Sequence, residues 1–396
     1  MCAYERGTVS DDGSTLSESH PLVVGVDLGG TQIRAAVLRG PTFLSRIGLL
    51  TGEHPSPDRL IPRLFQAVRQ ALDGVQITLD QIAGIGIGAT GPLNPWTGVV
   101  FAPPTLPGWN QVPLKDLFHE RFGVPIFVEN DANAAALAEY LFGAGRGWKE
   151  LVYMTVSTGI GGGILTDGKL LEGNSGTAAE LGHMTIDWQG ERCICGNVGC
   201  LEQLASGTAI ACAAQEAIAR GQGQAFIAFA LSHHSEDGMT SPSGDKAPDP
   251  VSPPQITART VAQAAEAGIP LACAIMSKAA EALGVGLVNI IHLFNPQLII
   301  LGSGVVQIGE LLLEPARRIV QARTMQAPLH TVQIIPAALG GKRRACRGRC
   351  PCVLSQAGRH VIILTVFSER AKGHRGEIGI YAQRHLVCGL AGGALK

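Results

Sequence analysis

The feature that most constrains the fold is a pair of apolar strands joined by glycine, which occurs twice. Leu22 to Leu38 reads "LVVGVDLGGTQIRAAVL", two β-rich runs around a turn of Asp27-Leu28-Gly29-Gly30-Thr31. Leu151 to Leu165, "LVYMTVSTGIGGGIL", repeats this plan some 130 residues later. Each hairpin opens a block of alternating strands and helices, so the sequence predicts two related α/β domains around a cleft.

Glycine-tipped hairpins have two interpretations. A single one is equally well explained as a tight turn that needs positive φ. Two together favour phosphate binding, because glycine lets backbone N–H groups approach an anion and Thr31, Ser157 or Thr158 can add hydroxyl donors. A third apolar run, Gln297 to Val306, meets Gly302-Ser303-Gly304 at the end of a predicted strand.

The segment "VENDANAAALAE" places polar residues where a strand ends and a helix begins. Ligands of α/β proteins bind at this kind of junction, and Asn130 and Asp131 stand there. Either residue alone can be an N-cap, worth about 1 kcal/mol. The two together can hold a hydroxyl, the amide fixing it and the carboxylate accepting its proton as a general base.

A metal site is predicted in "ELGHMTIDWQGERCICGNVGCLEQ". One imidazole and three thiols, from His183, Cys193, Cys195 and Cys200, suit a closed tetrahedral zinc site with a structural role. Buried free thiols are the alternative. Glu180 and Glu202 flank these ligands and are candidates for hydrogen bonding to a polyol.

Composition limits the class of protein. With 396 residues, 46% apolar content and 51 glycines, the chain can bury one large core or two ordinary ones. Its most apolar segment, residues 283–302, is interrupted by Asn289, His292 and Pro296, so no membrane span is predicted. The first 20 residues are polar and do not resemble a secretory signal. We therefore expect a cytoplasmic protein, in which clustered cysteines favour metal over disulfides.

Several motifs together resemble those of a known family. "VDLGGTQIRAAVL", "LPGWN", "VENDANAAALAEYLFGAGRG", "VSTGIGGGIL", "ELGH" and "CICGNVGCLE" occur in the order and spacing seen in bacterial sugar kinases of the ROK family (repressor, open reading frame, kinase), and most closely resemble its ATP-dependent glucokinases. The resemblance covers about residues 21–340. It implies the α/β sugar-kinase/actin-like ATPase fold, two domains closing on ATP and sugar, and a homodimer or homotetramer.

The resemblance also implies roles in the sugar site. Asp131 would be the base acting on the 6-hydroxyl of the sugar. His183 would serve zinc with one ring nitrogen and the sugar with the other. The residues that would hold the remaining hydroxyls are Asn130, Glu180, His183 and Glu202.

The nucleotide site follows from the same resemblance. Asp27 would approach the magnesium ion, and Gly302 and Gly304 would form the turn under the adenosine. Ser303 departs from the glycine commonly found between them. The residues that would cradle the ATP phosphates are Gly29, Gly30, Thr31, Thr158 and Gly159.

The expected activity is ATP-dependent phosphorylation of a hexose, with glucose first and N-acetylmannosamine, fructose or allose as alternatives. A ROK transcriptional repressor would need a helix-turn-helix domain, and 21 residues ahead of Leu22 are too few. A silent sugar-binding protein is a further alternative, against which the presence of Asp131 argues. Neither nucleic acid nor membrane is an expected partner.

The expected organisation is a disordered polar tail at 1–20, an N-terminal domain at 21–142, a C-terminal domain at 143–340 and a basic tail at 341–396. A proline-rich surface loop is predicted at about 236–256. After it, Thr257 is expected to cap a short helix closed by Gly268, and Pro270 to start a longer one reaching about Asn289.

The tail differs in charge from the rest of the chain. Residues 1–340 hold 20 Lys and Arg against 30 Asp and Glu, whereas residues 341–396 hold 11 against 2. The family resemblance stops after Gly340, and codons read one base later can spell the missing family motif Ala-Gly-Leu-x-Gly-Ala-Ala. We hypothesise a single-nucleotide shift near codon 341. This explains the basic charge and Cys346, Cys350 and Cys352 better than nucleic-acid binding or a second metal site, and predicts that the tail packs poorly.

Overall fold

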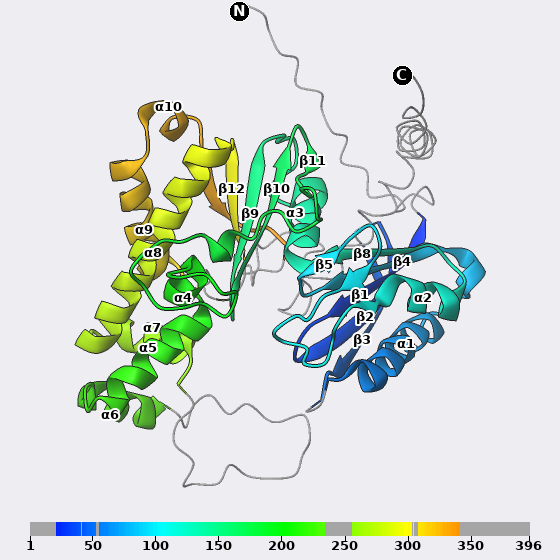
Figure 1. Cartoon of the computed structure of the whole chain (residues 1–396), viewed down its shortest axis with the longest axis horizontal. Helices are drawn as coiled ribbons and strands as arrows, with labels where there is room; N and C mark the ends of the chain where they lie inside the picture. Colours follow the sequence, from blue (N-terminus) through cyan, green and yellow to red (C-terminus); the bar gives the residue numbers. More distant parts are fainter. Residues whose placement is uncertain are drawn as a thin grey trace, which may run out of the picture.

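Two five-stranded sheets, each covered by helices, form two lobes with helix α3 (Asp131–Phe142) between them (Figure 1). The computed structural model describes residues 21–40, 42–52, 55–233, 256–302, 304 and 308–339. The predicted tails and nearly all of the proline-rich loop lie outside the described residues.

The first sheet contains the first glycine-tipped hairpin. Its order is β3-β2-β1-β4-β8, with β1, β2 and β3 antiparallel and with β4 and β8 parallel to β1. Helices α1 and α2 cover one face, where Phe65, Phe118 and Phe122 stack edge to face or tilted. The elements are β1 (Leu22–Leu28), β2 (Gln32–Arg39), β3 (Thr42–Leu50), β4 (Ile82–Ala89), β8 (Ile126–Asn130), α1 (Pro57–Asp73) and α2 (Leu114–Phe122), with η1 (Leu79–Gln81) before β4 and a small sheet of β5 (Leu93–Asn94), β6 (Val99–Val100) and β7 (Val112–Pro113).

The second sheet repeats the first. Its order is β11-β10-β9-β12-β13, with an antiparallel hairpin followed by two parallel strands. The strands are β9 (Leu151–Val156), β10 (Ile160–Thr166), β11 (Lys169–Leu170), β12 (Leu298–Gly302) and β13 (Gln333–Pro336). The matching strand orders agree with two related α/β units.

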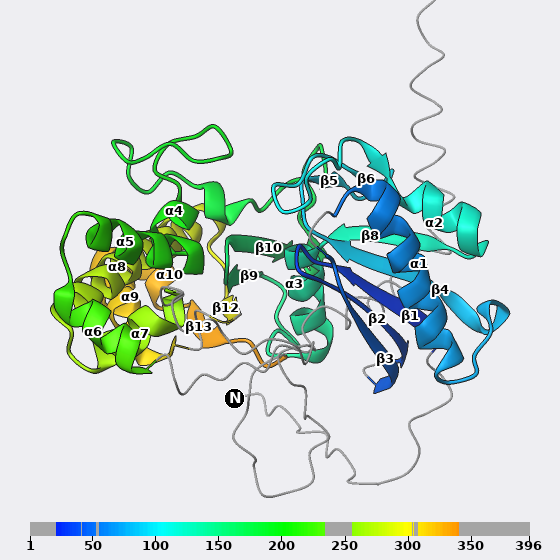
Figure 2. The same cartoon turned by 90° about the horizontal axis from the view of Figure 1, so that it is seen from below.

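Helices pack on the outer face of the second sheet (Figure 2). They are α4 (Leu201–Ala205), α5 (Gly207–Ala219), α6 (Gln224–His233), α7 (Ala258–Glu266), α8 (Pro270–Phe294), α9 (Glu310–Arg323) and α10 (Gln326–Leu329), with η2 (Leu181–His183) before α4. The Thr257 hydroxyl caps α7 by accepting the Thr260 N–H, as predicted.

Helix α8 is longer than predicted. It passes Asn289 and ends at Phe294, where Asn295 takes the left-handed conformation before Pro296. The half-buried Asn289 does not stop the helix, because Ile290 and Ile291 beyond it are fully buried. Within the described part of the chain, α8 is long and apolar enough to cross a membrane, but it is the core helix of the second lobe and more than half of its most apolar stretch is buried.

Helix α3 (Asp131–Phe142) packs against both sheets. Ala134 contacts the first sheet, whereas Ala135 and Ala136 belong to the core of the second. Side chains along β9 point to alternate faces of the sheet: Leu151 and Tyr153 face α3, whereas Val152 and Met154 face the outer helices. Helix α3 therefore packs between the two sheets, and the domain boundary at residue 142 stays a prediction.

Two glycines of β10 allow α3 to approach closely. A Cβ at Gly163 would lie 2.6 Å from the Ala136 Cβ, and one at Gly161 would lie 3.1 Å from the Ala132 Cβ. The glycine run 161–163 is thus explained by packing, and only Gly159 belongs to the hairpin tip. At the other end of α3, the buried Glu139 carboxylate accepts N–H bonds from Ala338 (3.2 Å) and Leu339 (2.6 Å), which ties the end of the described chain to this helix.

Candidate active site

A cleft of about 1460 Å³ lies between the lobes and collects most of the predicted site residues. Asp27 and Gly302 lie behind its wall: Asp27 is buried, and Gly302 is packed against the Tyr153 hydroxyl. The predicted residues that line it are Gly29, Gly30, Thr31, Asn130, Asp131, Thr158, Gly159, Glu180, His183, Cys195, Glu202 and Gly304.

Asn130 and Asp131 stand where β8 ends and α3 begins. The Asn130 Oδ1 accepts N–H bonds from Ala132 (2.9 Å) and Asn133 (3.3 Å), so Asn130 is the N-cap of α3. One Asp131 oxygen also accepts the Ala132 N–H, at 2.9 Å. Gly91 packs against the Asn130 amide nitrogen, because a Cβ there would lie 2.9 Å from it. The capping interpretation holds for Asn130, and the same bonds fix both side chains at the cleft wall.

Two glutamates from the second lobe face this junction. Burial raises the pKa of Glu180, an effect that His183 opposes and that Asp131 and Glu202 reinforce. These four groups are therefore close enough to interact electrostatically. The Glu202 Oε2 accepts the Ile160 N–H at 2.7 Å, and a Cβ at Gly159 would meet the same oxygen. Glu202 thus links the acidic end of the cleft to the second hairpin tip.

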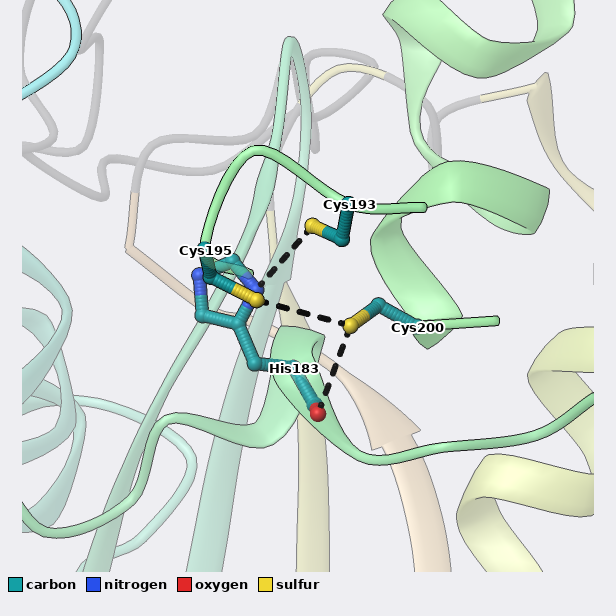
Figure 3. Close-up of side chains that lie close together, drawn as sticks. All are labelled: His183, Cys193, Cys195 and Cys200. Carbon is teal, nitrogen blue, oxygen red and sulfur yellow. Dashed lines mark hydrogen bonds between the residues drawn. The ribbon is translucent and has the colours of Figure 1, made fainter. Parts of the chain in front are cut away.

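The predicted metal ligands come together (Figure 3). The four ligand atoms lie within 4.8 Å of one another. The Cys193 Sγ lies 3.7 Å from the His183 Nδ1, and the Cys195 Sγ lies 3.7 Å from the Cys200 Sγ. Tetrahedral zinc with Zn–S bonds of about 2.3 Å separates its ligands by about 3.6 to 3.8 Å. The donor set and spacing fit that ion, and His183 also lines the cleft.

The thiols of this cluster differ in acidity. Burial opposes ionisation of Cys193, but the Cys195 N–H and the Gln203 side chain outweigh it and lower the pKa to about 7. Burial, together with the neighbouring thiols Cys195 and Cys193, raises the pKa of Cys200 to about 12. A metal ion would have to displace the proton from Cys200, so its binding would release protons.

Hydrogen bonds from neighbouring segments hold both hairpin tips in place. The Thr51 hydroxyl donates to the Gly29 carbonyl at 2.9 Å, and Gly30 packs against Thr105. In the second lobe, the Gly207 N–H donates to the Ser157 carbonyl at 2.6 Å, which places the start of α5 beside the tip.

Sequence reasoning missed one wall of the cleft. One face of α5 lines it with Ala209, Cys212, Ala213 and Glu216, and Lys278 of α8 and Arg34 of β2 also contribute. The spacing of the α5 residues is helical, but their types carry no catalytic signature. Within "LPGWN", Trp109 is core: it is fully buried and donates to the Pro55 carbonyl at 2.6 Å.

The two-lobed fold, with paired sheets and a central cleft, is the sugar-kinase/actin-like ATPase fold. Residues 23–354 match the model of the ROK family. The match extends past Gly340, where we placed the end of the resemblance. The chain belongs to the ROK family.

Relatives of two kinds are similar to the chain. A glucokinase from Streptomyces coelicolor is 35% identical over 81% of this chain and 94% of its own length. A xylose repressor from Caldicellulosiruptor bescii is 30% identical over 79% of this chain and 73% of its own. The crystal structure of a ROK family glucokinase from Streptomyces griseus in complex with glucose and AMPPNP has a TM-score of 0.66 and 32% identity, covering 86% of this chain and 97% of that one.

Proposed function

We propose that the protein is an ATP-dependent hexose kinase that phosphorylates the 6-hydroxyl of glucose. The observation that carries this proposal is the convergence of Asn130, Asp131, Glu180, His183 and Glu202 in the cleft that also holds both glycine tips. The similarity to glucokinases, one of them in complex with glucose and AMPPNP, supports glucose as the hexose. Such an enzyme would be a soluble cytoplasmic protein, and we expect a homodimer or homotetramer.

The acidic end of the cleft is suited to a sugar. Carboxylates accept hydrogen bonds from hydroxyls, and the Asn130 amide can donate one while its oxygen caps α3. Glu202 already accepts the Ile160 N–H, so its second oxygen would take the sugar. A cleft with this many placed acceptors would discriminate against a molecule that leaves them unpaired.

Phosphoryl transfer then requires little covalent chemistry from the protein. The 6-hydroxyl attacks the γ-phosphorus, its proton passes to Asp131, the new O–P bond forms, the bond to the bridging oxygen breaks and ADP leaves. Asp131 is held for this step by its bond to the Ala132 N–H and by its place in the first turn of α3. A positioned base contributes about 10²- to 10⁴-fold to the rate.

The glycine tips would hold the phosphates from both sides. Gly29, Gly30 and Thr31 belong to the first lobe, whereas Thr158 and Gly159 belong to the second, so binding of ATP would draw the lobes together. Magnesium, when bound, neutralises phosphate charge. Asp27, the residue predicted to approach the ion, is buried and its Oδ2 accepts a bond from Arg34, so it would reach the ion only through its other carboxylate oxygen.

We also propose a structural zinc ion held by His183, Cys193, Cys195 and Cys200. The His183 Nδ1 faces the cysteines, so the Nε2 would be left for a sugar hydroxyl. The ion would fix the loop at 184–200 and the imidazole at the wall of the cleft without touching phosphate.

Purified full-length chain tests the function directly. ADP release is coupled to NADH oxidation with glucose, N-acetylmannosamine, fructose, allose and xylose in turn, and with no sugar. We expect ADP release that depends on sugar, with the highest kcat/KM for glucose. Binding of sugar without ADP release would favour a silent or repressor-like protein. A higher kcat/KM for another hexose would contradict the proposal that glucose is the preferred substrate.

A further inference from the structure

We propose that Arg34 of β2 binds the terminal phosphate of ATP and that Asp27 positions it for this task. The inference rests on the proposed function, because it assigns a further residue of the same nucleotide site. The motif "VDLGGTQIRAAVL" contains this arginine, but neither that motif nor the metal cluster gives it a role.

The contacts of Arg34 fix its guanidinium at the cleft. Its Nη1 donates to the Asp27 Oδ2 at 2.8 Å, and its Nη2 donates to the Gln32 Oε1 at 2.7 Å. The Asp27 side chain is 4% exposed, whereas that of Arg34 is 24% exposed and lines the cleft. A guanidinium has five N–H donors, and these two bonds use two of them. The ion pair therefore holds the arginine from the buried side and leaves donors toward the cleft.

Strand register places Arg34 in line with the junction of β8 and α3. Arg34 pairs with Asp27, Asp27 with Gly88 and Gly88 with Glu129, which form one row across β2, β1, β4 and β8. Paired residues of neighbouring strands point to the same face, and this face is the one that packs on α3 through Ala134. Asp27 and Glu129 stand about 10 Å apart in this row, from strand spacings of about 4.8 Å.

The row has Arg34 at one end and, at the other, the strand that leads to the proposed base. Asp131, the proposed base, follows Glu129 by two residues, and the first hairpin tip precedes Arg34 by three. Gly88 contributes no side chain between the two ends of the row. A phosphate seated on Gly29 to Thr31 would therefore have the arginine on one side and the sugar hydroxyl toward the other.

The charge of the cleft strengthens the assignment. ATP brings about four negative charges into a cleft whose described lining contains Asp131, Asp187, Glu180, Glu191, Glu202 and Glu216. The Lys and Arg side chains of that lining are Arg34, from the first lobe, and Lys278, from the second. Phosphoryl transfer depends on positive groups placed against the γ-phosphate. Arg34 adjoins a glycine tip and is the better placed of the two.

Comparison of nucleotides that differ in the terminal phosphate tests the assignment. Titration calorimetry with magnesium measures the Kd of AMP-PNP, ADP and glucose for the full-length wild type and for Arg34→Ala, Arg34→Lys and Arg317→Ala. Arg317 is the matched control, since it forms an ion pair of 2.8 Å with Glu310 on α9 and does not line the cleft.

We expect Arg34→Ala to raise the Kd of AMP-PNP about 10- to 100-fold, the range of a charge-assisted hydrogen bond. The Kd of ADP should rise less than about 3-fold. Arg34→Lys keeps the charge beside Asp27 but loses the planar fork, so its loss should be intermediate. Glucose affinity should stay unchanged in both variants, and Arg317→Ala should match the wild type.

If Arg34→Ala weakens the binding of AMP-PNP and ADP equally, or weakens neither, the proposal is overturned and Arg34 is only the ion-pair partner of Asp27. If Arg34→Ala no longer binds glucose because it misfolds, the ratio of the two nucleotide affinities in Arg34→Lys decides. Failure of the wild type to bind either nucleotide would instead overturn the proposed function, and this assignment with it.

Discussion

Substitution of Gly163 by alanine tests the role of α3 as the support of the proposed base. The glycine lies in β10 directly beneath α3, and a Cβ there would lie 2.6 Å from the Ala136 Cβ, 3.0 Å from the Asn133 Cα and 3.1 Å from the Ala132 carbonyl oxygen. Non-bonded carbon atoms settle at about 3.5 to 4.0 Å. The helix must therefore move by about 1 Å, because two of these three neighbours are backbone atoms that cannot rotate away.

The displacement predicts two magnitudes. Overpacking of this kind costs about 1 to 3 kcal/mol of unfolding free energy, which lowers the Tm of a domain of this size by about 3 to 10 °C. A shift of about 1 Å in a positioned catalytic group costs about 10²-fold in rate. Asp131 begins α3, so kcat should fall in proportion to how much of the movement reaches the first turn.

Thermal unfolding and steady-state kinetics measure both effects. Gly48→Ala is the matched control, since Gly48 is also a strand glycine, in β3, and an added Cβ would meet nothing within 4 Å. We expect the control to keep the wild-type Tm within about 2 °C and to keep full kcat. A Gly163→Ala protein with unchanged Tm and kcat would refute the argument that this glycine exists to admit the helix.

Two further predictions concern the metal cluster and the acidic end of the cleft. Cys195→Ser should release the single zinc per chain, lower Tm and weaken glucose binding through His183, as metal analysis and calorimetry would show; a fully metal-free protein that still binds glucose would contradict this. Desolvation in the cleft, reinforced by Asp131 and Glu202, raises the pKa of Glu180 in the folded protein above its ordinary value. The sugar-free wild type therefore loses stability as pH rises from the unfolded-state pKa through the folded-state pKa. Glu180→Gln should therefore have the higher Tm at pH 8, with the difference vanishing below about pH 4, while its glucose affinity falls; a Tm advantage that is the same at both pH values would count against a raised pKa of Glu180.

Sequence patterns predicted much of the fold because the relevant signals are local. Alternating apolar residues and glycine turns located both hairpins, and the Thr257 cap and Pro270 located two helix starts. Where prediction failed, tertiary packing decided. Helix α8 continues past Asn289 because Ile290 and Ile291 are buried in the second lobe. The close approach of α3 to β10, which Gly161 and Gly163 permit, also depends on tertiary contacts that local signals do not encode.

The site shows the same division. Its cysteines, histidine and paired Asn130 and Asp131 are chemically distinctive, so their types and spacing predicted that they gather at the cleft, and their roles stay proposals. Arg34 and the cleft face of α5 were missed, because their importance lies in register and proximity. A strand arginine opposite a strand aspartate is ordinary in a sequence and becomes informative only when both lie beside a cleft.

The most direct test of the account is the Asp131→Asn variant assayed with glucose and ATP. The amide keeps the size of the side chain and can still accept the Ala132 N–H, but it cannot take the proton of the 6-hydroxyl. We predict wild-type zinc content and Tm, glucose affinity within about 3-fold of the wild type, and glucose-dependent ADP release lower by about 10²- to 10⁴-fold. An Asp131→Asn protein that keeps near-wild-type turnover while binding glucose would remove Asp131 from the mechanism and contradict the assignment of this cleft.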